Sequence, residues 1–382
     1  MDESIVDTDQ SPAAPASASL RDLLQLVLLP GLGPRTLARL LERFGTATKV
    51  LTADGEALAC VPNVGRKLVH TIRTAGDHVC ADQVLRWCDD QGVRLVRDTD
   101  ADYPMGLKDL DDAPPLLFLR GDWVDQDQLS VAMVGTRHAT TYGLKQAERL
   151  AFGLAKAGIT VVSGLARGID TAAHRGCLDG GGRTLAVLGG GLGEIYPAEN
   201  KPLADRCSQS GAVISEQPPY AKPRSGHFPQ RNRLIAAMSL ATLVIEAPDR
   251  SGSLITARQA YELNRDVLAL PGPVTSRTSR GCNQLIRDGA VLVQTVDDVL
   301  EAIGPMSNPV TTDEQTTIRS GAELQLNDIE RSVLQAIAPE STSIDTVIAQ
   351  SGLPAHRVIS TISVLEMRRL IRRLSSQYVA RI

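Results

Sequence analysis

The stretch SVAMVGTR, residues 130–137, joins an uninterrupted apolar run to a glycine, a hydroxyl and an arginine. Three further runs repeat this layout, at 159–162, 184–188 and 241–245, and each ends in a glycine-containing loop. Apolar runs without alternation are typical of strands that are buried on both faces of a parallel sheet. The sequence therefore predicts an α/β domain with an extended Rossmann-like parallel sheet over residues 91–303.

The loops after these runs predict an anion site. Glycine lets backbone N–H groups approach a ligand closely, and the N-terminus of a following helix adds partial positive charge. We expect the ligand to be a phosphate. The candidate residues in these loops are Gly135, Thr136, Arg137, Gly164, Arg167, Gly168, Gly189, Gly190, Ser251, Gly252 and Ser253.

The two commonest phosphate signatures are absent from the sequence. It contains no G-x-x-x-x-G-K-[ST], which argues against a P-loop NTPase. Residues 189–193 lack the G-x-G-x-x-G frame, and no acidic residue stands where a ribose would need one. We therefore expect neither a nicotinamide dehydrogenase nor a bound cofactor.

One basic segment favours a nucleic acid over a lone nucleotide. Residues 217–245 contain no Asp or Glu, although the chain has a net charge of -4. Cations that follow a phosphate backbone, together with an aromatic ring on which a base can stack, are typical of single-strand binding. Phe228 has the alternative role of anchoring a loop to the core. The candidates here are Lys222, Arg224, Phe228, Arg231, Asn232 and Arg233.

A set of ordered motifs over residues 95–300 resembles the DNA-processing protein A family, DprA or Smf. The motifs are GTR at 135–137, SGLARGID at 163–170 with Ala173-His174, YPAEN at 196–200, Ser215-Glu216, FPQRNR at 228–233, Glu246-Ala247 with SGSLITA at 251–257, and LPG at 270–272.

The resemblance implies a bacterial, cytoplasmic and non-catalytic protein. Such a protein binds single-stranded DNA, protects it and loads a RecA-type recombinase onto it during natural transformation. The resemblance also implies a homodimer formed through the Rossmann-like domain.

Carried over by motif, the resemblance assigns phosphate contacts to residues 135–137 and loop shaping to Gly164 and Gly168. It assigns strand contacts to Phe228, Arg231 and Arg233. Some members of the family place a lysine shortly before the phenylalanine. Because Ser225, Gly226 and His227 stand there, Lys222 or Arg224 would have to supply that charge.

The N-terminal stretch 1–19 is acidic and rich in Ala, Pro and Ser, which predicts a disordered tail and no signal peptide. No apolar run reaches the roughly 18 residues that span a bilayer. The six cysteines form no C-x-x-C pair, so we expect reduced thiols and no metal site. We expect no membrane association.

Residues 20–90 predict a small helical domain. The turn 29–33 and a weaker copy at 61–65 each precede an amphipathic pattern, as in a helix-hairpin-helix. The pair is similar to the sterile-alpha-motif-like N-terminal domain of the DprA family. The turns have two alternative roles: their N–H groups contact a DNA phosphate, or they only join helices.

The C-terminal part predicts a linker and a winged helix. Residues 304–322 are polar and carry no apolar period, which indicates a linker. Within 323–382, three helical patterns precede a terminal strand pair. Three roles of this module are open alternatives: contact with DNA, contact with a protein, and accessory stabilisation.

Two alternative functions belong to other classes. The spacing of Asp170 and His174 permits an acid–base pair. The nearest enzymatic alternative is a nucleotide N-glycosidase of the phosphoribohydrolase type, which shares this kind of sheet. However, that group uses P-G-G-x-G-T, and residues 249–254 read DRSGSL, without its first glycines or its catalytic acid in register. The winged helix also leaves open a DNA-binding regulator. We expect a binding protein and not an enzyme.

Overall fold

The structure is a computed structural model that describes residues 16–77, 80–303, 305–311, 317–375 and 377–382. It forms two compact units, Met1–Asp98 with Asp111–Leu117, and Thr99–Leu110 with Phe118–Ile382. Most of the expected tail lies outside the described residues. Helix α1 begins at Ala16, so the last four residues of the expected tail, 16–19, are helical instead.

The first unit is helical, as the sequence predicts, and resembles a pair of helix-hairpin-helix motifs. Leucines of α1 and α2 are fully buried in its core, among them Leu24, Leu26, Leu37 and Leu40. The helices are α1 (Ala16–Val27), α2 (Pro34–Phe44), α3 (Ala47–Thr52), α4 (Gly55–Ala59), α5 (Arg66–Arg73) and α6 (Ala81–Asp90), and β1 (Val93–Arg97) follows.

The second unit contains a largely parallel sheet with the strand order β2-β6-β5-β4-β3-β7-β8-β9. The four apolar runs form adjacent parallel strands, β5 (Thr184–Val187), β4 (Thr160–Ser163), β3 (Ser130–Val134) and β7 (Ala241–Val244), which confirms that prediction. The strands that the sequence analysis did not single out are β2 (Leu116–Gly121), β6 (Gly211–Ser215), β8 (Asp266–Ala269) and β9 (Val291–Leu292). Only β2 is antiparallel to its neighbour β6 within this order.

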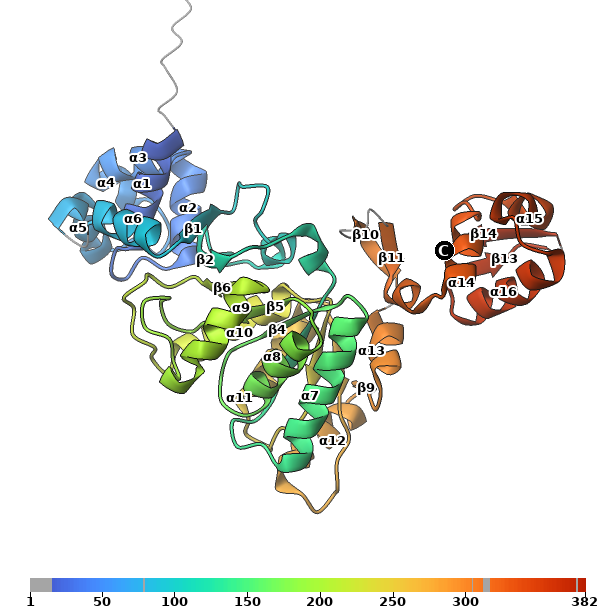
Figure 1. Cartoon of the computed structure of the whole chain (residues 1–382). Coiled ribbons are helices and arrows are strands. Elements are labelled where there is room, and N and C mark those ends of the chain that lie inside the picture. The colour runs from blue at the N-terminus through green and yellow to red at the C-terminus, as the bar shows by residue number, and fades with distance from the viewer. Residues whose placement is uncertain (1–15, 78–79, 304, 312–316, 376) are drawn as a thin grey trace, which may run out of the picture. The chain divides into compact units, whose positions relative to one another are not determined.

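Helices cover both faces of the sheet (Figure 1). Since parallel strands are joined by right-handed crossovers, connections that run in opposite directions along the sheet lie on opposite faces. One layer holds α7 (Thr141–Lys156), α8 (Ile169–Asp179), α9 (Lys201–Gln209) and α13 (Val296–Ile303), and the other holds α10 (His227–Ala237), α11 (Gly252–Glu262) and α12 (Arg280–Arg287). The core between the sheet and the first layer is aliphatic.

The direction of the chain reverses between β3 and β7. After β3 the chain continues through α7 to β4, and after β7 it continues through α11 to β8 on the other side. Open α/β sheets bind ligands in the crevice that this reversal leaves at the carboxyl ends of the strands. The loops at 135–137 and 248–253 border this switch point.

The stretch expected to be a linker contains a two-stranded antiparallel hairpin, β10 (Pro305–Thr311) and β11 (Thr317–Ser320), followed by the short 3-10 helix η6 (Gly321–Gln325). The rest confirms the predicted winged helix. It comprises α14 (Asp328–Gln335), α15 (Ile344–Ser351) and α16 (Ala355–Met367), with a sheet of β12 (Thr342–Ser343), β14 (Tyr378–Arg381) and β13 (Ile371–Arg373). Its own aliphatic core includes Val333, Val358 and Ile362.

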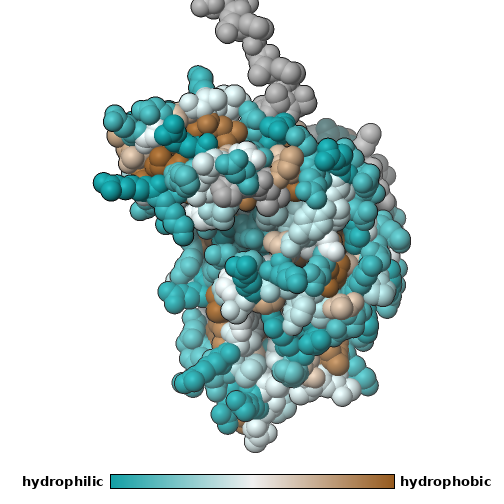
Figure 2. Space-filling model, turned by 90° about the vertical axis from the view of Figure 1, so that its left-hand side faces the viewer, coloured by the Kyte–Doolittle hydropathy of each residue, from teal (hydrophilic) through white to brown (hydrophobic). Residues whose placement is uncertain are grey.

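The surface that Figure 2 shows is mostly hydrophilic, and its apolar residues form small separate patches. Within the described residues, no helix is both long and apolar enough to cross a membrane. The same residues contain no group of three or more His, Cys, Asp or Glu placed to hold a metal ion.

Candidate nucleic-acid interface

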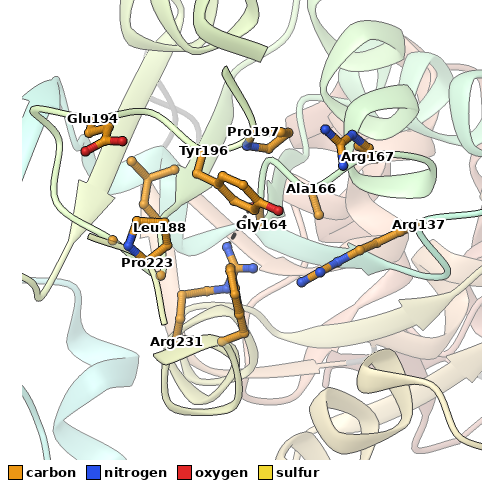
Figure 3. A pocket seen from close by; sticks show the side chains of 13 residues that line it. Arg137, Gly164, Ala166, Arg167, Leu188, Glu194, Tyr196, Pro197, Pro223 and Arg231 are labelled. Atoms are coloured by element: carbon orange, nitrogen blue, oxygen red, sulfur yellow. Dashed lines mark hydrogen bonds between the residues drawn. The ribbon is translucent and has the colours of Figure 1, made fainter. Parts of the chain in front are cut away.

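A small pocket, here called the glycine pocket, lies at the carboxyl ends of β4 and β5. Figure 3 shows the side chains of Arg137 and Arg231 pointing into it from two sides, below the ring of Tyr196. The residues that line it are Arg137, Gly164, Ala166, Arg167, Leu188, Gly189, Gly190, Glu194, Tyr196, Pro197, Pro223, Phe228 and Arg231.

Two glycines let α10 lie against these loops. A Cβ atom on Gly164 would lie 2.5 Å from the guanidinium carbon of Arg231, and one on Gly189 would lie 3.0 Å from the ring of Phe228. Both distances are too short for an unshifted neighbour. The loops therefore need glycine because two α10 side chains pack directly on their backbone.

Arg231 is a buried structural cation as well as a wall of the pocket. Its Nη1 donates to the carbonyl oxygen of Gly164 at 2.6 Å and to that of Val187, so it cross-links the ends of β4 and β5. Asp170 lies near it and accepts the backbone N–H groups of Gly164 and Ala166 at 3.1 and 3.3 Å. Burial lowers the pKa of Arg231 to about 10, the Asp170 charge opposes this, and the Arg137 charge adds to it. Arg231 therefore stays charged at neutral pH.

Arg137 is the exposed partner in this arrangement. Its guanidinium carbon lies 4.8 Å from the centre of the Phe228 ring. Two guanidinium groups that face one pocket repel each other, and Asp170 offsets only part of that charge. A bound phosphate would relieve the repulsion and accept hydrogen bonds from the exposed arginine.

Phe228 lies in the first turn of α10 and is half-buried, whereas the sequence suggested an exposed loop residue. Its ring packs against Tyr196, with centroids 6.1 Å apart and planes at 47°. Tyr196 is 46% exposed and was not among the predicted site residues. The sequence signal that could have identified Tyr196 as a site residue is its position as the aromatic residue of the YPAEN motif, residues 196–200.

A second depression, here called the switch-point groove, adjoins the glycine pocket and shares Arg137, Ala166, Phe228 and Arg231 with it. It lies between the loops of β3 and β7, at the N-terminus of α11. There the side chain of Ser251 accepts the backbone N–H of Ser253 and caps the helix. The groove brings together six further predicted residues: Gly135, Thr136, Asn232, Ser251, Gly252 and Ser253.

Four predicted residues lie outside both linings. Lys222 and Arg224 are exposed on either side of Pro223, and Gly168 adjoins the backbone contact from Ile169 N–H to Thr136 O. Arg233 is buried and its Nη2 lies 2.6 Å from the carboxylate of Glu216. This ion pair corrects the expectation that Arg233 reaches the strand, because its charge already serves a buried carboxylate.

Arg167 lines the glycine pocket, and its guanidinium pairs with Glu199. Both side chains are about half exposed. An exposed pair of this kind is weak and can exchange its carboxylate for a phosphate. Arg167 therefore remains a candidate contact at the rim.

Asp170 and His174 do not form the acid–base pair that their spacing permits. The carboxylate of Asp170 holds the loop N–H groups, and burial raises its pKa. His174 is fully buried, its Nδ1 lies 2.7 Å from Thr184 Oγ1, and Thr184 itself donates to Val161 O. His174 Nδ1 is thus the donor, and burial lowers the pKa of the ring to about 3. Asp170 therefore supports the β4 loop from within, and His174 is bonded to strand β5.

Comparisons with known proteins match this arrangement in all three parts of the chain. The family model for DNA recombination-mediator protein A matches residues 94–304, a DprA winged helix domain matches 319–377, and a SAM-like helix-hairpin-helix tandem matches 20–75. Protein Smf of Synechocystis is 34% identical over 371 residues, which cover 89% of this chain and 93% of that protein.

Two solved structures share the fold. DNA processing protein A from Streptococcus pneumoniae has a TM-score of 0.64 and 36% identity, and the match covers 73% of this chain and 95% of that one. The Helicobacter pylori protein, described by its single-stranded DNA binding mode, has a TM-score of 0.50 and 31% identity over 54% of this chain and 93% of that one.

Arg231→Ala is expected to destabilise the domain by about 3 to 5 kcal/mol, because it leaves the Asp170 charge and two carbonyl oxygens without their buried partner. The urea midpoint of unfolding measures this. Arg175→Ala, which removes an exposed arginine of α8, is the matched control and is expected to change stability by less than about 0.5 kcal/mol. Equal midpoints for the two variants would contradict a structural role for Arg231.

Proposed function

The chain belongs to the DNA recombination-mediator protein A family, DprA or Smf, and on that basis we propose that it binds single-stranded DNA and loads a RecA-type recombinase onto it during natural transformation. Arg137 and Arg231 carry the proposal, because both guanidinium groups face one glycine-lined pocket. The Helicobacter pylori relative, described as a single-stranded DNA binder, supports the same ligand.

The proposed mode of binding assigns different tasks to the two depressions. Arg137, the loop of β3 and the N-terminus of α11 hold phosphates in the switch-point groove. Phe228 and Tyr196 offer apolar faces to bases at the glycine pocket. Because backbone contact and stacking do not read base edges, the protein binds strands of different sequence with similar affinity.

We further propose that the protein acts in the cytoplasm, and that it acts by binding DNA and not by catalysis. Support comes from Asp170 and His174, whose spacing in the sequence permits an acid–base pair. Asp170 is committed to two loop N–H groups, and His174 is fully buried and neutral at physiological pH. Incubation with nucleoside monophosphates, followed by assay for free base, tests the enzymatic alternative.

We also propose a homodimer formed through the Rossmann-like domain. Strand β9 stands at the end of the strand order, and its two residues, Val291 and Leu292, are 42% and 45% exposed. An edge strand with exposed apolar side chains is a ready pairing surface for a second copy.

Arg137→Ala is expected to weaken binding of single-stranded DNA at least tenfold, because loss of a charged hydrogen bond costs about 1.5 to 3 kcal/mol. The slope of log affinity against log salt should fall by about 0.7. Fluorescence anisotropy with mixed-sequence and thymine-rich strands measures both. The same variant should lose its stimulation of recombinase assembly on DNA.

The melting temperature of Arg137→Ala should stay unchanged, since the side chain is exposed. Arg175→Ala, with the same change of charge outside both linings, should bind like the unaltered protein. Unchanged affinity together with lower stability would instead make Arg137 a structural residue.

Phe228→Ala separates stacking from packing. A stacking role predicts a loss of about 1 to 3 kcal/mol in affinity for oligothymidine, and retention of most of it in Phe228→Trp. A packing role predicts a loss of about 3 to 5 kcal/mol in stability instead. Because the ring is half-buried against Tyr196, binding and denaturant unfolding are both measured. Intact affinity of the folded fraction would remove Phe228 from the DNA site.

Leu292→Arg is expected to convert the dimer into monomers, because it places a charge on the apolar edge. Sedimentation velocity measures the change. The control is Arg287→Ala, which alters an exposed residue at the end of α12. A monomeric unaltered protein, or a variant that remains dimeric, would refute this interface.

A further inference from the structure

The carboxyl edge of the sheet continues past the switch-point groove. Strands β3, β7 and β8 are consecutive parallel neighbours, so their carboxyl ends meet at one edge. The groove is built from the loops of β3 and β7. The next loop along this edge, residues 270–279, joins β8 to α12 (Figure 1). It contributes to the lining of neither the glycine pocket nor the groove.

Backbone hydrogen bonds fasten this loop to the groove. Ala247 N–H donates to Thr278 O at 2.8 Å, and Gly281 N–H donates to Ala247 O at 2.8 Å. The hydroxyl of Thr278 also donates to the buried carboxylate of Glu246 at 3.2 Å. Three residues beyond Ala247 stands Arg250, which lines the groove. The β8–α12 loop therefore holds a fixed position beside the groove wall.

The exposed side chains of this loop suit a continuing nucleic-acid strand. Val274 is 84% exposed, the highest value among the exposed large hydrophobic residues that the structure describes. Arg277 in the loop and Arg280, the first residue of α12, are exposed, and residues 270–279 contain no Asp or Glu. The neighbouring loop contributes one exposed carboxylate, that of Asp249, which lies 3.8 Å from the guanidinium group of Arg280.

The charge around these two loops is therefore positive. Residues 248–254 and 270–280 carry three exposed arginines, Arg250, Arg277 and Arg280, and one exposed carboxylate, Asp249, while the chain as a whole has a net charge of -4. An excess of cations next to an apolar tip is the combination that contacts phosphates and covers a base or sugar.

Resting on the proposed function, we propose that the β8–α12 loop is a second contact segment for the same single strand. The strand leaves the switch-point groove past Arg250, its next phosphates contact Arg277 and Arg280, and Val274 packs against a base or sugar. Since β8 lies two strands from β3, the loop is about 10 Å farther along the edge. A few further nucleotides of the strand cover that distance.

The proposal predicts an effect that depends on strand length. The test uses fluorescence anisotropy with labelled oligothymidines of about 4 to about 16 nucleotides. The double variant Arg277→Ala/Arg280→Ala should bind the shortest strands normally. It should bind the longest about tenfold more weakly, with a salt slope lower by about 1.4.

Two single variants sharpen the test. Arg287→Ala removes an exposed arginine from the opposite end of α12 and should leave the whole length series unchanged. Asp249→Asn removes the carboxylate beside Arg280 and should strengthen binding of long strands severalfold. A gain of affinity cannot result from damage to the fold.

The outcomes separate this inference from the proposed function. A double variant with the length dependence of the unaltered protein, while Arg137→Ala still weakens binding, overturns the second contact segment alone. An equal loss at every length also overturns it, because the arginines would then act on the groove itself. Failure of the unaltered protein to bind any strand overturns the proposed function instead.

Discussion

The buried guanidinium of Arg231 is the constraint on which the candidate site depends. It joins the carbonyl ends of β4 and β5, and Asp170 beside it holds the N–H groups of the same β4 loop. Buried charges are costly without partners, so this pair is stable only while both loops keep their conformation. The pocket walls are therefore already in place before any ligand binds.

A second buried charge performs the same task across the switch point. The carboxylate of Glu246 accepts the N–H and the hydroxyl of Thr140 at 2.9 and 2.6 Å and the hydroxyl of Thr278 at 3.2 Å. It thereby ties the loops that follow β3, β7 and β8 to one another. Arg231, Asp170 and Glu246, all buried, hold the carboxyl edge, and the exposed arginines remain available to a ligand.

The sequence predicted the central strands and the two terminal helical modules because each has a strong periodic or uninterrupted apolar pattern. It could not predict which arginines are exposed to solvent and which are buried. Arg137, Arg231 and Arg233 all stand near loop or turn signals, and only tertiary packing determines that the first is exposed and the other two are buried. The pairing of Arg233 with Glu216 could not be predicted either, because Glu216 lies 17 residues earlier in the chain.

Phe228 shows a different limit of sequence reasoning. Gly226 and Pro229 are residues typical of loops, yet α10 begins at His227. Proline is tolerated in the first turn of a helix because the N–H groups there have no partner inside the helix. The same residues therefore fit a loop and a helix start, and the difference decides how far the ring is exposed.

The pairing of arginines with carboxylates determines which arginines on the surface are available to bind a polyanion. Arg167 and Arg280 pair with Glu199 and Asp249 in exposed positions, where an ion pair contributes little and a phosphate can take the place of the carboxylate. The Arg233–Glu216 pair is buried, and exchange there would leave a carboxylate without its partner. Exposure, and not the number of arginines, therefore determines how many cations a strand can reach.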